Sequence, residues 1–198
     1  MNITDTRGKR ISFTGQSLDY KNYLPYSDTF IETGTAAGDG VQRALDAGFE
    51  SIVSIEAATM WYDQCKSRFK STPGIDIVFG KSTVMLPGML AAFVGPLVIF
   101  LDAHPAGVLS AGHSDWIADP NGEWAQDNII QAELRIILTH RPDHIIIIDD
   151  VNGMTDGCAE KYMDLCLAAN PNYRFEFWSE NLSGDLLYTD KILVCLPS

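Results

Sequence analysis

The segment around Glu32 constrains this chain more than any other part of its sequence. An apolar run ends in Glu32 and is followed at once by a glycine-containing segment, and a second apolar run, residues 51–55, ends in another acid, Glu56. This order predicts a strand, a tight turn, a helix and a second strand parallel to the first. Gly34 and Gly38 allow the backbone to turn sharply and to approach a ligand closely. The pattern predicts a β-turn-α-β unit that holds a nucleoside, with Glu56 placed to accept both ribose hydroxyls.

The rest of the chain repeats the alternation of apolar runs and helical periods. The runs are short and continuous, as in parallel strands covered on both faces. We therefore predict an α/β fold, a Rossmann-like doubly wound sheet that is mostly parallel, has seven strands and ends in a C-terminal antiparallel hairpin. The predicted strands are 29–33, 51–55, 75–79, 97–101, 144–148, 173–179 and 191–196, and the predicted helices are 38–47, 59–70, 82–93, 127–140 and 155–169.

We divide the chain into an N-terminal arm, residues 1–28, and a single ligand-binding domain, residues 29–198. The arm is polar and rich in tyrosine, and we expect little regular structure in it apart from a short helix near residues 17–23. The segment 103–124 is long for a connection between a strand and a helix, so we interpret it as a lid or a wall of the substrate site.

Composition limits the partners and the compartment. The 198 residues carry a formal net charge of −12, which disfavours a nucleic-acid partner because the surface repels phosphates. The four cysteines lack metal-ligand spacing and are interpreted as reduced thiols. The longest apolar stretch, residues 89–101, is too short to span a bilayer. We expect a cytoplasmic protein with no membrane partner, and we leave a homo-oligomer open.

Acidic residues also follow two later strands. Asp102 and His104 come directly after the fourth predicted strand, and Asp149 and Asp150 come after the fifth. Ligands of open α/β sheets bind outside the carboxyl ends of the strands, so these side chains are expected to meet at one edge. Glu133, on the helix between those strands, is expected to be solvated.

The order Glu32-Thr-Gly34-Thr-x-x-Gly38, then Glu56, then Leu101-Asp102-Ala-His104, then Ile148-Asp149-Asp150 resembles the class I S-adenosylmethionine-dependent methyltransferases, in a small bacterial and phage-like branch. The resemblance covers essentially the whole chain from Tyr26 onward. It implies that the turn containing Glu32, Gly34, Thr35 and Gly38 holds the methionine part of S-adenosyl-L-methionine and that Glu56 binds the ribose hydroxyls.

Two positions depart from that family. Ala36 stands where a second glycine is usual, which leaves less room for a dinucleotide pyrophosphate than for a methionyl group. The family commonly has an acid facing the adenine amine after the third strand, and this chain has Lys81 there, which cannot accept a hydrogen bond. Ser82 or a backbone carbonyl is the expected substitute.

The resemblance also implies the chemistry. The metal-dependent O-methyltransferases hold magnesium at similar strand ends, so Asp102, Asp149 and Asp150 form a candidate Mg²⁺ site. Direct contact between Asp102 and the substrate, with Asp149 or Asp150 bonded to a loop, is the alternative. Asp102 and His104 are the candidate catalytic residues, with His104 as the general base. We expect transfer of a methyl group to a small-molecule acceptor, most simply to an oxygen.

Three other activities stay open. The chain could bind S-adenosylmethionine as a non-catalytic scaffold or catalyse a different reaction on it, because fold resemblance does not fix the reaction. An NAD-dependent oxidoreductase would use the same ribose-binding acid. It usually has glycine at position 36 and a Tyr-x-x-x-Lys pair, neither of which this sequence has at the expected place.

Overall fold

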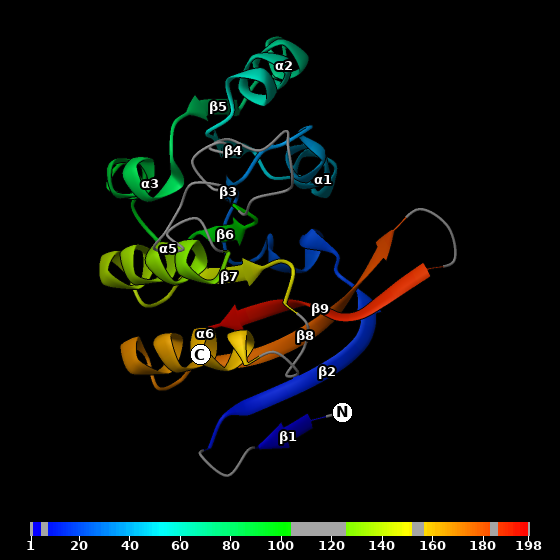
Figure 1. Cartoon of the computed structure of the whole chain (residues 1–198), viewed down its shortest axis with the longest axis vertical. Helices are drawn as coiled ribbons and strands as arrows, with labels where there is room; N and C mark the ends of the chain where they lie inside the picture. Colours follow the sequence, from blue (N-terminus) through cyan, green and yellow to red (C-terminus); the bar gives the residue numbers. More distant parts are fainter. Residues whose placement is uncertain (1, 5–7, 104–125, 152–156, 183–185, 198) are drawn as a thin grey trace, which may run out of the picture.

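The computed structural model describes residues 2–4, 8–103, 126–151, 157–182 and 186–197. Nine strands in these residues form one sheet in the order β1-β2-β8-β9-β7-β6-β3-β4-β5 (Figure 1). The strands are β1 (Asn2–Thr4), β2 (Arg10–Ser17), β3 (Thr29–Thr33), β4 (Ser51–Glu56), β5 (Ile75–Phe79), β6 (Val98–Leu101), β7 (Ile145–Ile148), β8 (Arg174–Leu182) and β9 (Leu186–Leu196).

Helices cover both faces of the sheet. They are η1 (Tyr20–Tyr23), α1 (Asp39–Ala47), α2 (Thr59–Phe69), α3 (Ser82–Leu90), α5 (Gln126–His140) and α6 (Cys158–Ala169). One buried apolar cluster joins α3, α5 and α6 to the sheet, and a second joins η1, α1 and α2 to its other face. Figure 1 shows this division, with α3, α5 and α6 together on one side of the strands. The fold therefore has three layers and two cores.

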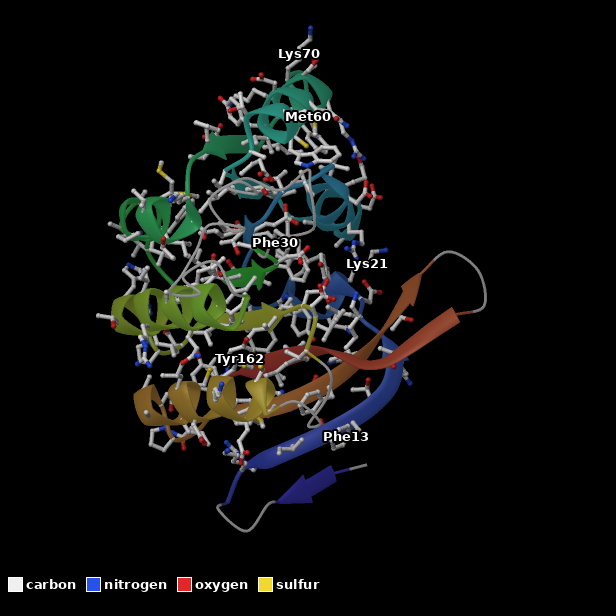
Figure 2. The ribbon with its side chains drawn as sticks, in the orientation of Figure 1. Phe13, Lys21, Phe30, Met60, Lys70 and Tyr162 are labelled. Carbon is white, nitrogen blue, oxygen red and sulfur yellow. The ribbon has the colours of Figure 1, made fainter. Side chains whose placement is uncertain are left out.

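The central strands are short and apolar because both of their faces are covered. β6 and β7 are buried along their whole length, and β7 consists of four isoleucines. Successive residues of β3 point to opposite cores, so that Phe30 packs in the cluster with η1 and Ile31 in the cluster with α5. Phe30 lies near the middle of the molecule, whereas Lys70 lies at its periphery beside α2 (Figure 2).

The fold class predicted from the sequence is confirmed, including the final antiparallel pair. β5, β4, β3, β6 and β7 are parallel neighbours, and β9 runs antiparallel to both β7 and β8. The prediction of seven strands was wrong, because β1 and β2 extend the sheet beyond β8. β2 pairs with β8 in parallel, and β1 pairs with β2 in antiparallel.

The extra strands correct the interpretation of residues 1–28 as an arm with little regular structure. Ile11 is buried, and Phe13 stacks on Phe177 of β8 with ring centroids 5.0 Å apart. Phe13 lies on β2 in Figure 2. The buried ammonium group of Lys9 also lies 2.6 Å from Asp164 of α6. The short helix expected near residues 17–23 is present as η1.

Other predictions concern residues outside the described ranges. His104 and nearly all of the predicted lid, residues 103–124, lie there, so their interpretation stays a prediction. Within the described part of the chain, no helix has the length and apolar character needed to cross a membrane.

Candidate functional site

The residues singled out from the sequence meet at the carboxyl edge of the sheet. Thr33, at the end of β3, pairs in register with Ile55 of β4 and with Leu101 of β6, and Leu101 pairs with Ile148 of β7. The residues that follow these positions therefore share one edge: Gly34, Glu56, Asp102 and Asp149. The strand order reverses between β3 and β6, which is where open α/β sheets bind ligands.

The turn after β3 depends on glycine at two positions. Gly34 has a φ of 84°, and a Cβ added to it would lie 2.4 Å from the carbonyl oxygen of Asp102. Gly38 has a φ of 86°, and a Cβ there would lie 2.8 Å from the ring of Phe69. Ala36 has a φ of 44°, so alanine occupies a left-handed conformation that usually favours glycine. The turn therefore keeps a glycine-like backbone despite the substitution.

Below the turn, three polar side chains form a buried chain of hydrogen bonds. The hydroxyl of Ser54 donates to Oε2 of Glu32 at 2.5 Å and lies 2.6 Å from Oγ1 of Thr35. A Cβ on Gly40 would lie 1.7 Å from Oε1 of Glu32, so α1 packs directly on this carboxyl group. Burial raises the pKa of Glu32 to about 8, and the nearby Asp102 and Glu56 carboxylates add to the shift against the opposing Ser54 hydrogen bond. Glu32 thus links β3, β4 and α1 under the turn.

Glu56 is held by backbone amides on both of its carboxylate oxygens. The amide of Ala36 donates to Oε2 at 2.8 Å, and the amide of Ala58 donates to Oε1 at 2.7 Å. These two bonds fix the carboxylate between the turn after β3 and the start of α2. A carboxylate oxygen keeps a further lone pair when it accepts one hydrogen bond, so Glu56 can still accept from a diol.

The predicted magnesium site does not fit the structure. The ammonium group of Lys191 on β9 lies 2.9 Å from Oδ1 of Asp150 and 4.0 Å from Oδ1 of Asp149. Oδ1 of Asp149 also accepts from the amide of Asp150 at 2.7 Å. Among the residues that the structure describes, no group of three or more His, Cys, Asp and Glu side chains could hold a metal ion. A lysine cation therefore lies where a divalent cation was expected.

Glu133 corrects another prediction, because its side chain is completely buried rather than solvated. It extends from α5 toward the edge of the sheet, where the hydroxyl of Thr33 donates to its Oε2 at 3.3 Å. The hydroxyl of Ser82, the first residue of α3, lies near this carboxyl group and stabilises its charged form. Burial raises the pKa of Glu133 to about 8, against the opposing hydrogen bonds of Ser82 and Thr33. Its Oε1 atom has no hydrogen-bond partner within the described ranges.

Tyr20 of η1 brings a buried phenol to the same region. Its ring packs on Phe30 and Phe100, with centroid distances of 5.2 and 5.7 Å. Burial raises the pKa of Tyr20 well above its ordinary value, opposed by Arg43, and the Glu32, Asp149 and Asp102 carboxylates raise it further. Its hydroxyl is buried and finds no hydrogen-bond partner in the part of the chain that the structure describes.

Sequence reasoning missed Ser54, Glu133 and Lys191 as members of this site. Ser54 could have been found, because a serine inside a strand buried on both faces requires a polar partner. Glu133 and Lys191 gave no comparable local signal, since their importance comes from where α5 and β9 pack.

Comparison with known proteins supports the fold. No protein-family model matches the sequence, and no curated protein matches it significantly. Solved structures do match. An O-methyltransferase from Bacillus cereus in complex with SAH has a TM-score of 0.56 at 17% identity, over 86% of this chain and 74% of that one. The O-methyltransferase TomG from Streptomyces achromogenes, in complex with SAM, has a TM-score of 0.58 at 15% identity, over 88% and 75%.

A third structure is that of a protein from Streptococcus mutans, named as a methyltransferase and in complex with SAH. It has a TM-score of 0.54 at 8% identity, over 88% of this chain and 93% of that one. The chain therefore has the fold of the class I S-adenosylmethionine-dependent methyltransferases.

Proposed function

We propose that this protein is a methyltransferase that moves the methyl group of S-adenosyl-L-methionine to a small acceptor, most simply to a hydroxyl oxygen. The observation that carries the proposal is the arrangement at the carboxyl edge of the sheet around Gly34. The tight turn lies between the buried Glu32 and Glu56, whose carboxylate is held by backbone amides, at the place where the strand order reverses. The solved structures of similar fold bind SAM or SAH, which supports the same cofactor here.

The residues divide between cofactor and acceptor. Gly34, Thr35 and Gly38 shape the turn for the methionine part, with Glu32 supporting it from below. Glu56 accepts from the ribose hydroxyls, and Ser82 lies at the adenine end. These assignments are part of the proposal; the resemblance to the methyltransferase family suggests them, and the positions of the residues along the edge support them.

Asp102 is the proposed residue between the cofactor and the acceptor. Its amide donates to the carbonyl of Thr33 at 3.0 Å, which fixes it beside the turn. His104, two residues later, is proposed as the base that removes the acceptor proton. Methyl transfer to an oxygen needs a deprotonated nucleophile held in line with the sulfonium, so positioning and one base suffice.

The test is direct. Purified protein is incubated with S-adenosyl-L-methionine and a panel of hydroxylated and amino-bearing small molecules, and the products are analysed by mass spectrometry for an added methyl group. We expect methylated products among the hydroxylated acceptors. An Asp102→Asn variant should bind S-adenosylhomocysteine but lose turnover, and full activity in that variant would refute the role of Asp102.

A second candidate is a protein that binds S-adenosylmethionine without transferring its methyl group. The Lys191 ion pairs favour it, because they occupy two acids that the resemblance assigns to chemistry. This candidate predicts cofactor binding with no methylated product from any acceptor in the panel.

A further inference from the structure

We propose that Glu133 recognises the adenine amine of the cofactor, in place of the acid that is missing at position 81. The inference rests on the proposed function, since it concerns the same nucleoside site. It assigns the adenine contact to a side chain from α5, a helix that lies far from the turn after β5 in the sequence.

The carboxyl group of Glu133 lies near the end of β3 and the start of α3. This carboxyl group accepts from Thr33 at the end of β3, and its charged form is stabilised by the nearby Ser82 hydroxyl at the start of α3. Ser82 is at the end proposed for adenine and directly follows Lys81, the N-cap residue of α3, whereas Thr33 lies beside that end, at the turn proposed for the methionine part. Glu133 therefore places an acceptor where Lys81 has none.

One carboxyl oxygen of Glu133 has no hydrogen-bond partner in the described part of the chain. A buried polar atom without a hydrogen bond destabilises the folded protein, so few such atoms remain in native structures and each needs an explanation. Glu133 is completely buried, and its Oε1 lacks a hydrogen-bond partner within the described residues. The bond from Thr33 and the nearby Ser82 hydroxyl hold the carboxyl group in place, and Oε1 keeps the capacity to accept from a donor.

The hydrogen-bonding groups near Glu133 are complementary to those on the 6-amino edge of adenine. The 6-amino edge of the ring offers one donor, the amine, next to one acceptor, the ring nitrogen. The site offers the converse pair. Oε1 of Glu133 is an acceptor when the carboxyl is ionised, and the first amides of α3, at Ser82 and Thr83, are donors that have no partner within the helix. A ring with a carbonyl at position 6 would instead face the carboxylate with a second acceptor.

The experiment compares two ligands that differ only at that edge. S-adenosylhomocysteine and its deaminated analogue S-inosylhomocysteine are titrated calorimetrically into the wild-type protein at about pH 8, where a large fraction of the Glu133 carboxyl is ionised despite its raised pKa and the inosine ring keeps its proton. One lost hydrogen bond and an opposed pair of acceptors should weaken the analogue by about tenfold or more in the wild type.

Glu133→Leu should bring the two dissociation constants to within about threefold of each other. The ratio isolates the amine contact, because general damage to the pocket weakens both ligands alike. Leu138→Ala, a buried substitution on the same helix, is the control and should keep the wild-type ratio. If Glu133→Leu does not fold, Thr33→Val removes a bond that holds the carboxyl group and should lower the ratio.

An unchanged ratio in Glu133→Leu, or a wild-type ratio near one, would overturn the inference while leaving the proposed function intact. Where only Thr33→Val folds, an unchanged ratio in that variant would overturn it equally. Failure of the wild type to bind either ligand would overturn both.

Discussion

Replacing Gly34 by alanine tests how the turn after β3 is joined to β6. The added Cβ would lie 2.4 Å from the carbonyl oxygen of Asp102 and 2.7 Å from its carbonyl carbon. Both are backbone atoms of the residue that directly follows β6, so the clash cannot be relieved by moving a side chain. Relief requires the turn to separate from the end of β6, which displaces Asp102 from the cofactor edge.

Two glycines make it possible to divide the expected cost. Gly48 has a φ of 104°, but a Cβ there would meet only a Leu24 methyl group at 3.5 Å. Gly48→Ala should therefore cost only the left-handed backbone penalty, about 1–2 kcal/mol. Gly88 in α3 has nothing within 4 Å of an added Cβ, so Gly88→Ala should be neutral or stabilise the helix by up to about 1 kcal/mol.

Gly34→Ala combines the backbone penalty with overpacking against a rigid neighbour, which adds about 1–3 kcal/mol. The sum is about 2–5 kcal/mol, or a decrease in Tm of about 4–20 °C in a domain of this size. Thermal unfolding and titration with S-adenosylhomocysteine are measured for all three variants. Only Gly34→Ala should also lose cofactor affinity, by about tenfold or more. The reasoning is refuted if Gly34→Ala matches Gly48→Ala in both stability and affinity.

Three further predictions concern polar side chains with identified partners. Ser54→Ala leaves Glu32 and Thr35 without their shared partner, so urea unfolding should show a loss of about 1–3 kcal/mol, and a loss below about 0.5 kcal/mol would contradict the hydrogen-bond chain. Lys191→Ala exposes Asp149 and Asp150 to cations, so Mg²⁺ should raise the Tm of this variant but not that of the wild type; an equal shift in both would show that Lys191 does not exclude the metal. His144 accepts from the amide of Leu97 at 3.0 Å, and burial lowers its pKa to about 4. The unfolded state therefore binds the proton more tightly, and stability that is complete above about pH 6.5 should fall toward pH 4, by about 1–2 kcal/mol at pH 5. Urea titrations of His144→Gln should lack this component, and an unchanged pH dependence would assign it to other groups.

The central part of the fold was predictable because its sequence signals are local. Strand 29–33 was predicted with its observed bounds, as was strand 75–79, and the helix predicted at 38–47 begins one residue later. Continuous apolar runs such as Ile145–Ile148 can only be stable when covered on both faces, which determined the parallel sheet. The glycines of the turn then placed the cofactor edge.

The outer part of the sheet was not predictable in the same way. β2, with the sequence Arg10–Ser17, carries few apolar residues because it pairs beyond β8 and only part of it is buried. Its pairing is decided by contacts with residues more than one hundred and fifty positions away, such as the bond from Ser12 to the carbonyl of Phe175. No local pattern in residues 1–28 reports such a partner.

The residues of the candidate site likewise fall into those with a local sequence signal and those placed only by packing. Glu32, Gly34 and Glu56 were identified because each directly ends a strand or forms the turn. Glu133 and Lys191 act from the middle of α5 and from β9, and their relation to the edge exists only after the layers pack. Lys191 also explains why the acid pattern at 149–150 was misleading, because the charge that balances those acids comes more than forty residues later in the sequence.

The most direct test of the account is a calorimetric titration of the wild-type protein with S-adenosylhomocysteine, with NAD as the comparison ligand. The account predicts one binding site per chain with micromolar affinity for S-adenosylhomocysteine and no comparable heat with NAD. A folded protein that binds NAD in preference, or that gives no heat with S-adenosylhomocysteine, would contradict the assignment of the edge around Gly34 as a site for S-adenosylmethionine.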